Sequence, residues 1–260
     1  MQPAIFVSHG SPMMAIEDNV TTEFFTKLGQ QLEAPKAVIV FSAHFDRSDA
    51  VYVTGAENLS TIHDFYGFPQ PLYQIQYPAK GKTELTDNVV ERLTKAGFPV
   101  KRDDQIGLDH GAWIPLKFMY PNHDIPVVSV SINSRASAGV HYFLGEQLRS
   151  LREEGVLILG SGGISHNLRE IFSNFPDAKR VDKVNAFVDW AEDAVKNRDV
   201  DALTHYMEKA PHASFNHPSP DHYLPLPSIL GASYEHEHGR KIHKNIDLEI
   251  LALDAYQFGV

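Results

Sequence analysis

Short runs of consecutive apolar residues alternate along the chain with longer segments in which apolar residues recur every three or four positions. β-Branched residues dominate the short runs, a pattern typical of strands that are covered on both faces. The longer segments have the spacing of amphipathic helices, and in the clearest of them Gly97 closes the pattern. We predict strands within 3–9, 36–44, 125–133 and 156–162, and helices within 21–32, 82–97, 142–155 and 181–198.

This alternation predicts an α/β fold in which a mainly parallel central sheet has helices on both faces. No internal repeat, low-complexity tract or linker composition marks a boundary, so we expect residues 1–260 to form a single domain. Residues 54–80 interrupt the alternation with a segment rich in proline and aromatic residues. A loop of this length inside a compact domain is more often functional than idle.

Histidines follow three of the predicted strands. His9 ends the first run in FVSHGSP, His44 ends a second in AVIVFSAHF, and His166 follows the glycines of VLILGSGGISHN. In an open α/β sheet, ligands bind outside the carboxyl ends of the strands, so we expect these side chains at one edge of the sheet. Imidazole is the commonest metal-binding side chain. For His9 and His44, which small residues flank, we favour metal ligation over a structural role.

Other histidines have two interpretations each. His110 follows Asp109 in GLDHGAW and belongs either to a surface turn or to the site. His217 and His222 bracket the proline-stiffened loop HPSPDHYLPL, which either aims a side chain or only connects two elements. The tract YEHEHGRKIH at 234–243 lacks HExxH spacing and carries many charges, so we expect a surface hairpin there rather than a second metal site.

Composition restricts the metal chemistry and the partners. The chain has no cysteine and 14 histidines, so nitrogen and oxygen ligands must hold any metal. The formal charge of −10 disfavours nucleic acid and anionic membranes as partners. We find no run as long as a membrane span and no signal-peptide pattern, so we expect a cytoplasmic location. The sequence leaves open whether the chain forms a homo-oligomer.

Six motifs, in this order, resemble the class III extradiol ring-cleavage dioxygenases of the LigB-like, 4,5-DOPA dioxygenase type: FVSHGSP, FSAHF, IHDFYGFPQPLY, LDHGAW, SHNL and HPSPDHYLPL. The resemblance extends over nearly the whole chain. It implies a single catalytic domain with one mononuclear divalent metal at the strand ends, and O2 as the co-substrate in opening a small, DOPA-like aromatic diol. It also implies residue roles: metal ligands His9, His44 and His222, an acid/base at His166, and a second catalytic histidine over the substrate at His110.

The third ligand differs from that of many relatives, which hold Fe(II) with two histidines and one glutamate. The matching position here reads Asp221-His222, and the resemblance assigns His222, with Asp221 as its partner or as an alternative ligand. Three neutral imidazoles suit Zn(II) as well as Fe(II). Fe(II) would support the oxygen chemistry, whereas zinc has no accessible redox chemistry.

The aromatic residues of 54–80 predict a wall for the substrate ring, formed by Phe65, Tyr66, Phe68 and Tyr73. The same residues could instead pack only on the core. We expect substrate contacts from five residues of the motifs: His63, Asp64, Phe65, Tyr66 and Tyr223.

Two other functions stay as alternatives. A zinc-dependent hydrolase would use the same imidazoles to polarise water, and it would need no oxygen. A non-catalytic metal-binding paralogue would keep the scaffold as a docking surface, but docking alone would not require an acid/base pair.

Overall fold

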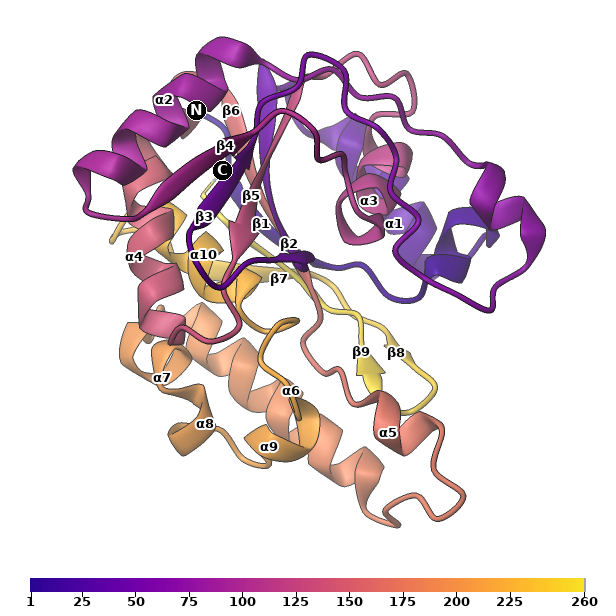
Figure 1. Cartoon of the computed structure of the whole chain (residues 1–260). Helices are drawn as coiled ribbons and strands as arrows, with labels where there is room; N and C mark the ends of the chain where they lie inside the picture. The colour runs from indigo at the N-terminus through magenta and orange to yellow at the C-terminus, as the bar shows by residue number, and fades with distance from the viewer. Residues whose placement is uncertain (260) are drawn as a thin grey trace.

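The computed structural model describes residues 1–259. An eight-stranded sheet runs through the centre of the molecule (Figure 1). In spatial order its strands are β4 (Val100–Asp103), β3 (Val51–Thr54), β5 (Val127–Ile132), β2 (Ala37–Asp46), β6 (Val156–Gly162), β1 (Ala4–Ser8), β10 (Ala255–Phe258) and β7 (Gly239–His243). A small second sheet pairs β8 (Ile246–Asp247) with β9 (Leu251–Ala252).

The four middle strands, β5, β2, β6 and β1, pair in parallel. Antiparallel pairs occur toward the edges, where β10 joins β1, β7 joins β10 and β3 joins β5. Every residue of β1, β5 and β6 is buried, as expected for strands with both faces covered. The predicted α/β fold with a mainly parallel central sheet is therefore confirmed.

Helices cover both faces of this sheet (Figure 1). On one face lie α1 (Val20–Gln31) and α3 (His110–Met119), and on the other lie α2 (Thr83–Lys95), α4 (Ala138–Leu148) and α10 (Pro225–Ala232). Near β7 lies α6 (Arg180–Lys196), followed by the short helices α7 (Val200–Thr204), α8 (Tyr206–Lys209) and α9 (Ala213–Asn216). The remaining helical turns are η1 (Pro12–Ile16), η2 (Gln70–Gln74), η3 (Arg149–Arg152) and α5 (Leu168–Ile171).

Helices α4 and α10 cross closely because each presents a glycine to the backbone of the other. A Cβ atom at Gly145 would lie 1.9 Å from the carbonyl oxygen of Ser228, and one at Gly231 would lie 1.9 Å from that of Tyr142. A larger residue at either position would push the helices apart. Because α10 begins just after His222, this crossing helps to set where that histidine lies.

The predicted strands and helices correspond to elements of the structure, with two corrections. The strand predicted within 36–44 is β2 and continues two residues past His44, to Asp46. The tract 234–243 is not a surface hairpin: its second half is β7, the edge strand of the main sheet, which pairs with β10. Within residues 1–259, no helix is both long enough and apolar enough to cross a membrane.

Candidate metal centre

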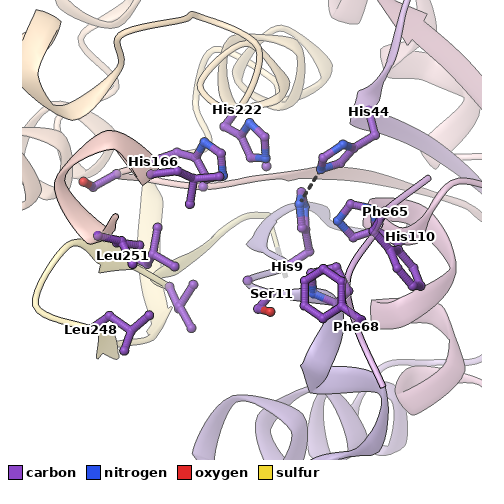
Figure 2. Close-up of a pocket in the computed structure, with 18 of the residues that line it drawn as sticks. His9, Ser11, His44, Phe65, Phe68, His110, His166, His222, Leu248 and Leu251 are labelled. Atoms are coloured by element: carbon purple, nitrogen blue, oxygen red, sulfur yellow. Dashed lines mark hydrogen bonds between the residues drawn. The ribbon is translucent and has the colours of Figure 1, made fainter. Parts of the chain in front are cut away.

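Five histidines from separate segments surround one pocket at the carboxyl ends of the neighbouring strands β1, β2 and β6 (Figure 2). His9 directly follows β1, His44 lies near the end of β2, and His166 follows β6. His110 is the first residue of α3, and His222 lies between α9 and α10. The structure thus brings together the histidines that the motifs singled out.

The segment that carries His110 is not a surface turn, because both Asp109 and His110 are buried. Asp109 is the N-cap of α3 and accepts a hydrogen bond from the backbone N–H of Ala112 at 3.2 Å. The Ser42 hydroxyl donates to the Asp109 carboxylate at 2.5 Å. Burial raises the pKa of Asp109 to about 6. These contacts fix the start of the helix and therefore the position of His110.

Hydrogen bonds determine which nitrogen of His9 faces the pocket. Its Nδ1 lies 3.1 Å from Ser161 Oγ, and the Ser161 hydroxyl itself donates to the carbonyl oxygen of Gly111 at 2.5 Å. Since the hydroxyl hydrogen is used there, the Ser161 oxygen accepts a hydrogen from His9 Nδ1. The Nε2 atom of His9 therefore carries a lone pair.

Asp64 determines which ring nitrogen of His110 carries the hydrogen, and it also lies close to His44. The backbone N–H and the Nδ1–H of His110 both donate to the Asp64 carboxylate at 2.9 Å. The Nδ1 atom of His44 lies 3.4 Å from the same carboxylate. An ionised carboxylate only accepts hydrogen bonds, so the ring of His110 carries its hydrogen on Nδ1 and a lone pair on Nε2, while the contact with His44 is electrostatic. Burial raises the pKa of Asp64, but the hydrogen bonds from His110 outweigh it and hold the pKa below its usual range.

His222 has a carboxylate partner of its own. Its Nδ1 lies 2.5 Å from Asp221 Oδ2, which leaves Nε2 free. Burial raises the pKa of Asp221, but the hydrogen bond from His222 outweighs it and keeps the pKa below its usual range. The ring of His166 stacks on the ring of His222, with centroids 3.4 Å apart and planes 5° apart. Asp221 thus acts on His222 as a hydrogen-bond acceptor, the arrangement that orients metal-binding histidines.

The spacing of these rings fits one shared ion. The Nε2 atoms of His9 and His44 lie 3.0 Å apart, and ligand nitrogens on one ion are separated by about 3.0 Å when bonds of about 2.1 Å meet at right angles. For angles between about 90° and 109°, such bonds put ring centroids about 4.6 to 5.3 Å apart. The centroids of His9, His44 and His222 are separated by 5.0, 5.2 and 4.9 Å.

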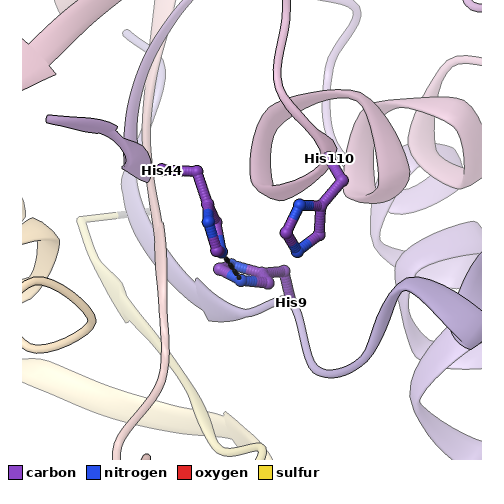
Figure 3. A group of neighbouring side chains, drawn as sticks. All are labelled: His9, His44 and His110. Atoms are coloured by element: carbon purple, nitrogen blue, oxygen red, sulfur yellow. Dashed lines mark hydrogen bonds between the residues drawn. The ribbon is translucent and has the colours of Figure 1, made fainter. Parts of the chain in front are cut away.

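Two groups of potential ligands share this pocket. The ligand atoms of His9, His44 and His110 all lie within 4.8 Å of one another (Figure 3), and so do those of His166, Asp221 and His222. Ring spacing therefore favours His222 as the third of three ligands, whereas the distances between ligand atoms favour His110. Histidines and carboxylates without thiolate suit Fe(II) and Zn(II) alike.

The rings at the centre of the pocket are neutral. Burial lowers the pKa values of His9, His44 and His166, and the neighbouring imidazoles lower them further. Because only a neutral imidazole has a lone pair to offer, this environment keeps the ligands in the form that binds a metal.

The pocket has a volume of about 410 Å³, a size typical of small-molecule sites. In Figure 2, Phe65 and Phe68 lie on one side of the histidines, while Leu248 and Leu251 lie on the other. Tyr66 also lines the pocket. Three of the four residues of the predicted aromatic wall therefore border the site.

Three of the five predicted contact residues do not line the pocket, namely His63, Asp64 and Tyr223, and neither does the predicted wall residue Tyr73. Tyr223 does not reach the pocket: it is fully buried, it stacks on Tyr206, and its hydroxyl donates to the Leu203 carbonyl oxygen at 2.9 Å. His63 bonds through Nε2 to the backbone oxygen of Ile75. Tyr73 packs behind Phe65, with ring centroids 5.3 Å apart. Neither His63 nor Tyr73 lines the pocket.

The remaining histidine motifs are structural. His217 is buried, and its Nε2–H donates to the Ile164 carbonyl oxygen at 2.8 Å. In the tract 234–243, His236 and His238 are exposed, and His243 stacks on Phe24 of α1. None of these residues belongs to either group of potential ligands among residues 1–259.

Several residues that line the pocket or orient its histidines carry no signal in the sequence. Ser161 reads as part of an apolar strand, although it orients His9. Leu248, Leu251 and Phe172 line the pocket from segments that no motif marks. Only their long-range contacts reveal them.

Comparison with known proteins assigns the family. The family model described as the catalytic LigB subunit of aromatic ring-opening dioxygenase matches residues 3–252. A 4,5-DOPA dioxygenase extradiol of Beta vulgaris is 38% identical over 263 residues, covering 99% of this chain and 97% of that protein. The protein of the same name from Escherichia coli K12 is 42% identical over 238 residues, covering 88% of this chain and 84% of that protein.

Solved structures agree with this result. The crystal structure of an uncharacterized protein from Escherichia coli K12 matches with a TM-score of 0.80 and 33% identity, and the match covers 100% of both chains. The chain therefore belongs to the LigB family and is an extradiol ring-opening dioxygenase, as its six motifs predicted.

Proposed function

We propose that this enzyme opens the ring of a catechol, with O2 as co-substrate, at a single divalent metal held by His9, His44 and His222. The observation that carries the proposal is the 3.0 Å approach of the Nε2 atoms of His9 and His44. His9 Nε2 carries a lone pair, so at this distance either a hydrogen on His44 Nε2 or a shared cation lies between the two atoms, and we propose the cation for the loaded enzyme. The relatives from Beta vulgaris and Escherichia coli are both named for DOPA, which makes DOPA the first catechol to test.

The native metal of this proposal is Fe(II). Bound there, Fe(II) would pass electrons from the catechol to O2 and would offer open coordination positions, whereas Zn(II) has no accessible redox chemistry. The three neutral ligands would accept either ion, so metal loading decides activity.

His166 is the proposed acid/base. Its ring lies against His222, and no hydrogen bond within residues 1–259 engages its ring nitrogens. A ring nitrogen without a fixed partner is free to take a proton from a catechol hydroxyl and to return it later. General acid–base catalysis of this kind contributes about 10²- to 10⁴-fold in rate.

His110 is the proposed second catalytic histidine. Asp64 holds the hydrogen on its Nδ1, so Nε2 is presented as an acceptor toward the pocket. It would accept a hydrogen bond from the second hydroxyl of the catechol and hold the diol in place. The rings of Phe65 and Phe68 would pack against the substrate ring.

Anaerobic reconstitution with Fe(II), followed by O2 and a panel of catechols that includes DOPA, tests the proposal. We expect oxygen uptake together with a yellow, ring-opened product, and no turnover by a parallel zinc-loaded sample. Iron-loaded protein that consumes no oxygen with any catechol would refute the proposal. Hydrolysis by the zinc-loaded protein without oxygen would instead favour the hydrolase, for which the relatives give no support.

Other expectations stay predictions. We propose a cytoplasmic enzyme whose partner is a small aromatic diol and not a nucleic acid, in keeping with the formal charge of −10. A single catalytic domain over residues 1–260 and a homo-oligomer are likewise open to direct measurement.

A further inference from the structure

We infer that the enzyme prefers catechols whose ring substituent is uncharged and apolar over catechols that carry an amino-acid side chain. The inference rests on the proposed function, because it assumes that the diol faces the histidines. The substituent then points toward the walls and the mouth of the pocket, which therefore decide which catechol is accepted.

The walls of the pocket are apolar. Apart from the histidines, none of the described side chains that line it is ionisable near neutral pH. Of the two serine hydroxyls in the lining, Ser165 donates to the Ile250 carbonyl oxygen, and Ser11 accepts from the Met13 N–H and keeps its hydrogen, but a neutral hydroxyl supplies no counter-charge. A substrate carboxylate or ammonium would find no counter-charge there, and a charge that leaves water without a partner is strongly disfavoured.

Several charged side chains near the pocket are already engaged elsewhere, whereas Arg169 is exposed in an adjoining hollow and lies outside the pocket lining. Asp64 holds His110, and Asp221 holds His222. Arg180 pairs with Glu249 at 2.6 Å, and both line a separate hollow beside the pocket. No lysine or arginine of the described chain reaches the lining, so a DOPA carboxylate would have to stay in solvent.

The mouth of the pocket adds an independent observation. Three large side chains that line it are strongly exposed: Tyr66 by 90%, Phe172 by 80% and Leu248 by 60%. Clustered exposed apolar groups at the edge of a cavity mark a binding surface. An alkyl or aryl substituent that leaves the pocket would cover these groups and remove apolar surface from water. A zwitterionic substituent would have to keep its hydration water there and would therefore bury less apolar surface of these side chains.

Binding to the zinc-loaded protein without oxygen tests the inference separately from catalysis. The probes are 4-methyl-, 4-ethyl-, 4-propyl- and 4-butylcatechol, compared with dopamine, 3,4-dihydroxyphenylacetate and DOPA. We expect the dissociation constant to fall about fourfold per added methylene, and each charged catechol to bind no more tightly than 4-methylcatechol. Tighter binding of DOPA than of 4-propylcatechol would overturn the inference. Turnover of the same catechols by the iron-loaded enzyme tests the proposed function independently.

Two phenylalanines of one surface segment provide a matched pair of variants. Phe172 lines the pocket, whereas Phe175 is 92% exposed and lies outside it. Phe172→Arg should tighten the binding of 3,4-dihydroxyphenylacetate about two- to fivefold, as expected for an exposed ion pair, and should weaken that of 4-butylcatechol. Phe175→Arg should change neither. Equal effects of the two variants would show that this wall does not face the substituent and would overturn the inference.

Discussion

The imidazole rings of His166 and His222 lie face to face, with their centroids 3.4 Å apart and their planes only 5° apart. His222 has a carboxylate on Nδ1, and His166 has no comparable partner among residues 1–259. Two stacked rings of the same chemistry are thus given different environments. This difference is the physical basis for assigning metal binding to one ring and proton transfer to the other.

Replacing His166 should separate metal binding from turnover. His166→Ala should keep the metal content of the parent enzyme and lower kcat about 10²- to 10⁴-fold, because only the acid/base is lost. Metal analysis together with oxygen uptake on the same iron-loaded sample measures both quantities. Normal turnover by this variant would show that the proton is carried by another group.

His222 and His110 compete for the place of the third ligand. His222→Ala should abolish stoichiometric metal uptake, as should His9→Ala and His44→Ala, whereas His110→Ala should retain the ion and lose turnover. Atomic absorption after dialysis against limiting metal distinguishes the variants. His238→Ala, at an exposed position outside both groups, is the control. Metal loss in His110→Ala with retention in His222→Ala would exchange the two assignments.

Asp64→Asn should lower metal affinity or activity, because the carboxylate contacts both His110 and His44. An amide has one acceptor oxygen, so it cannot orient His110 and His44 in the same way. Loss of such an outer partner typically reduces metal affinity or activity about 10- to 100-fold, which we expect here. Titration of the metal-free protein with Zn(II) measures the affinity. Asp87→Asn, at the exposed partner of Arg102, is the control and should bind zinc like the parent. Unchanged zinc affinity and turnover in Asp64→Asn would argue that the carboxylate is dispensable.

His141 should make stability depend on pH. It is buried in α4, where Nδ1 donates to the Ser137 carbonyl oxygen and Nε2 accepts from the Asn133 N–H. Burial lowers the pKa of His141, so below pH 6.5 the unfolded chain binds a proton that the folded chain does not. The free energy of unfolding should therefore fall as the pH drops below 6.5, by at most about 1.4 kcal/mol per pH unit from this group.

Urea unfolding of metal-free protein between pH 7.5 and 5.5 measures this slope. His141→Gln should be less stable at pH 7.5, because it cannot make both hydrogen bonds, yet it should lose less stability on acidification than the parent. Parallel pH profiles for the two proteins would exclude a contribution from this residue.

Apolar runs and helical spacing predicted the central strands and α2, because burial on both faces and amphipathic packing leave local patterns in the sequence. The motifs likewise identified the histidines around the pocket. Tyr223 shows the limit of such reasoning: it follows His222 in the chain, but its side chain points into the core and bonds to Leu203. Leu248 and Phe172 reach the pocket only through tertiary contacts, and no local pattern reports those.

The histidines of the pocket come from five segments spread between residues 9 and 222. No isolated fragment of the chain contains all five histidines in this arrangement, so the site forms only when the sheet and its covering helices are assembled. Ion uptake should accordingly report the integrity of the whole tertiary structure. A chelator should lower the free energy of unfolding of the loaded protein in proportion to the logarithm of the factor by which it reduces the free ion concentration.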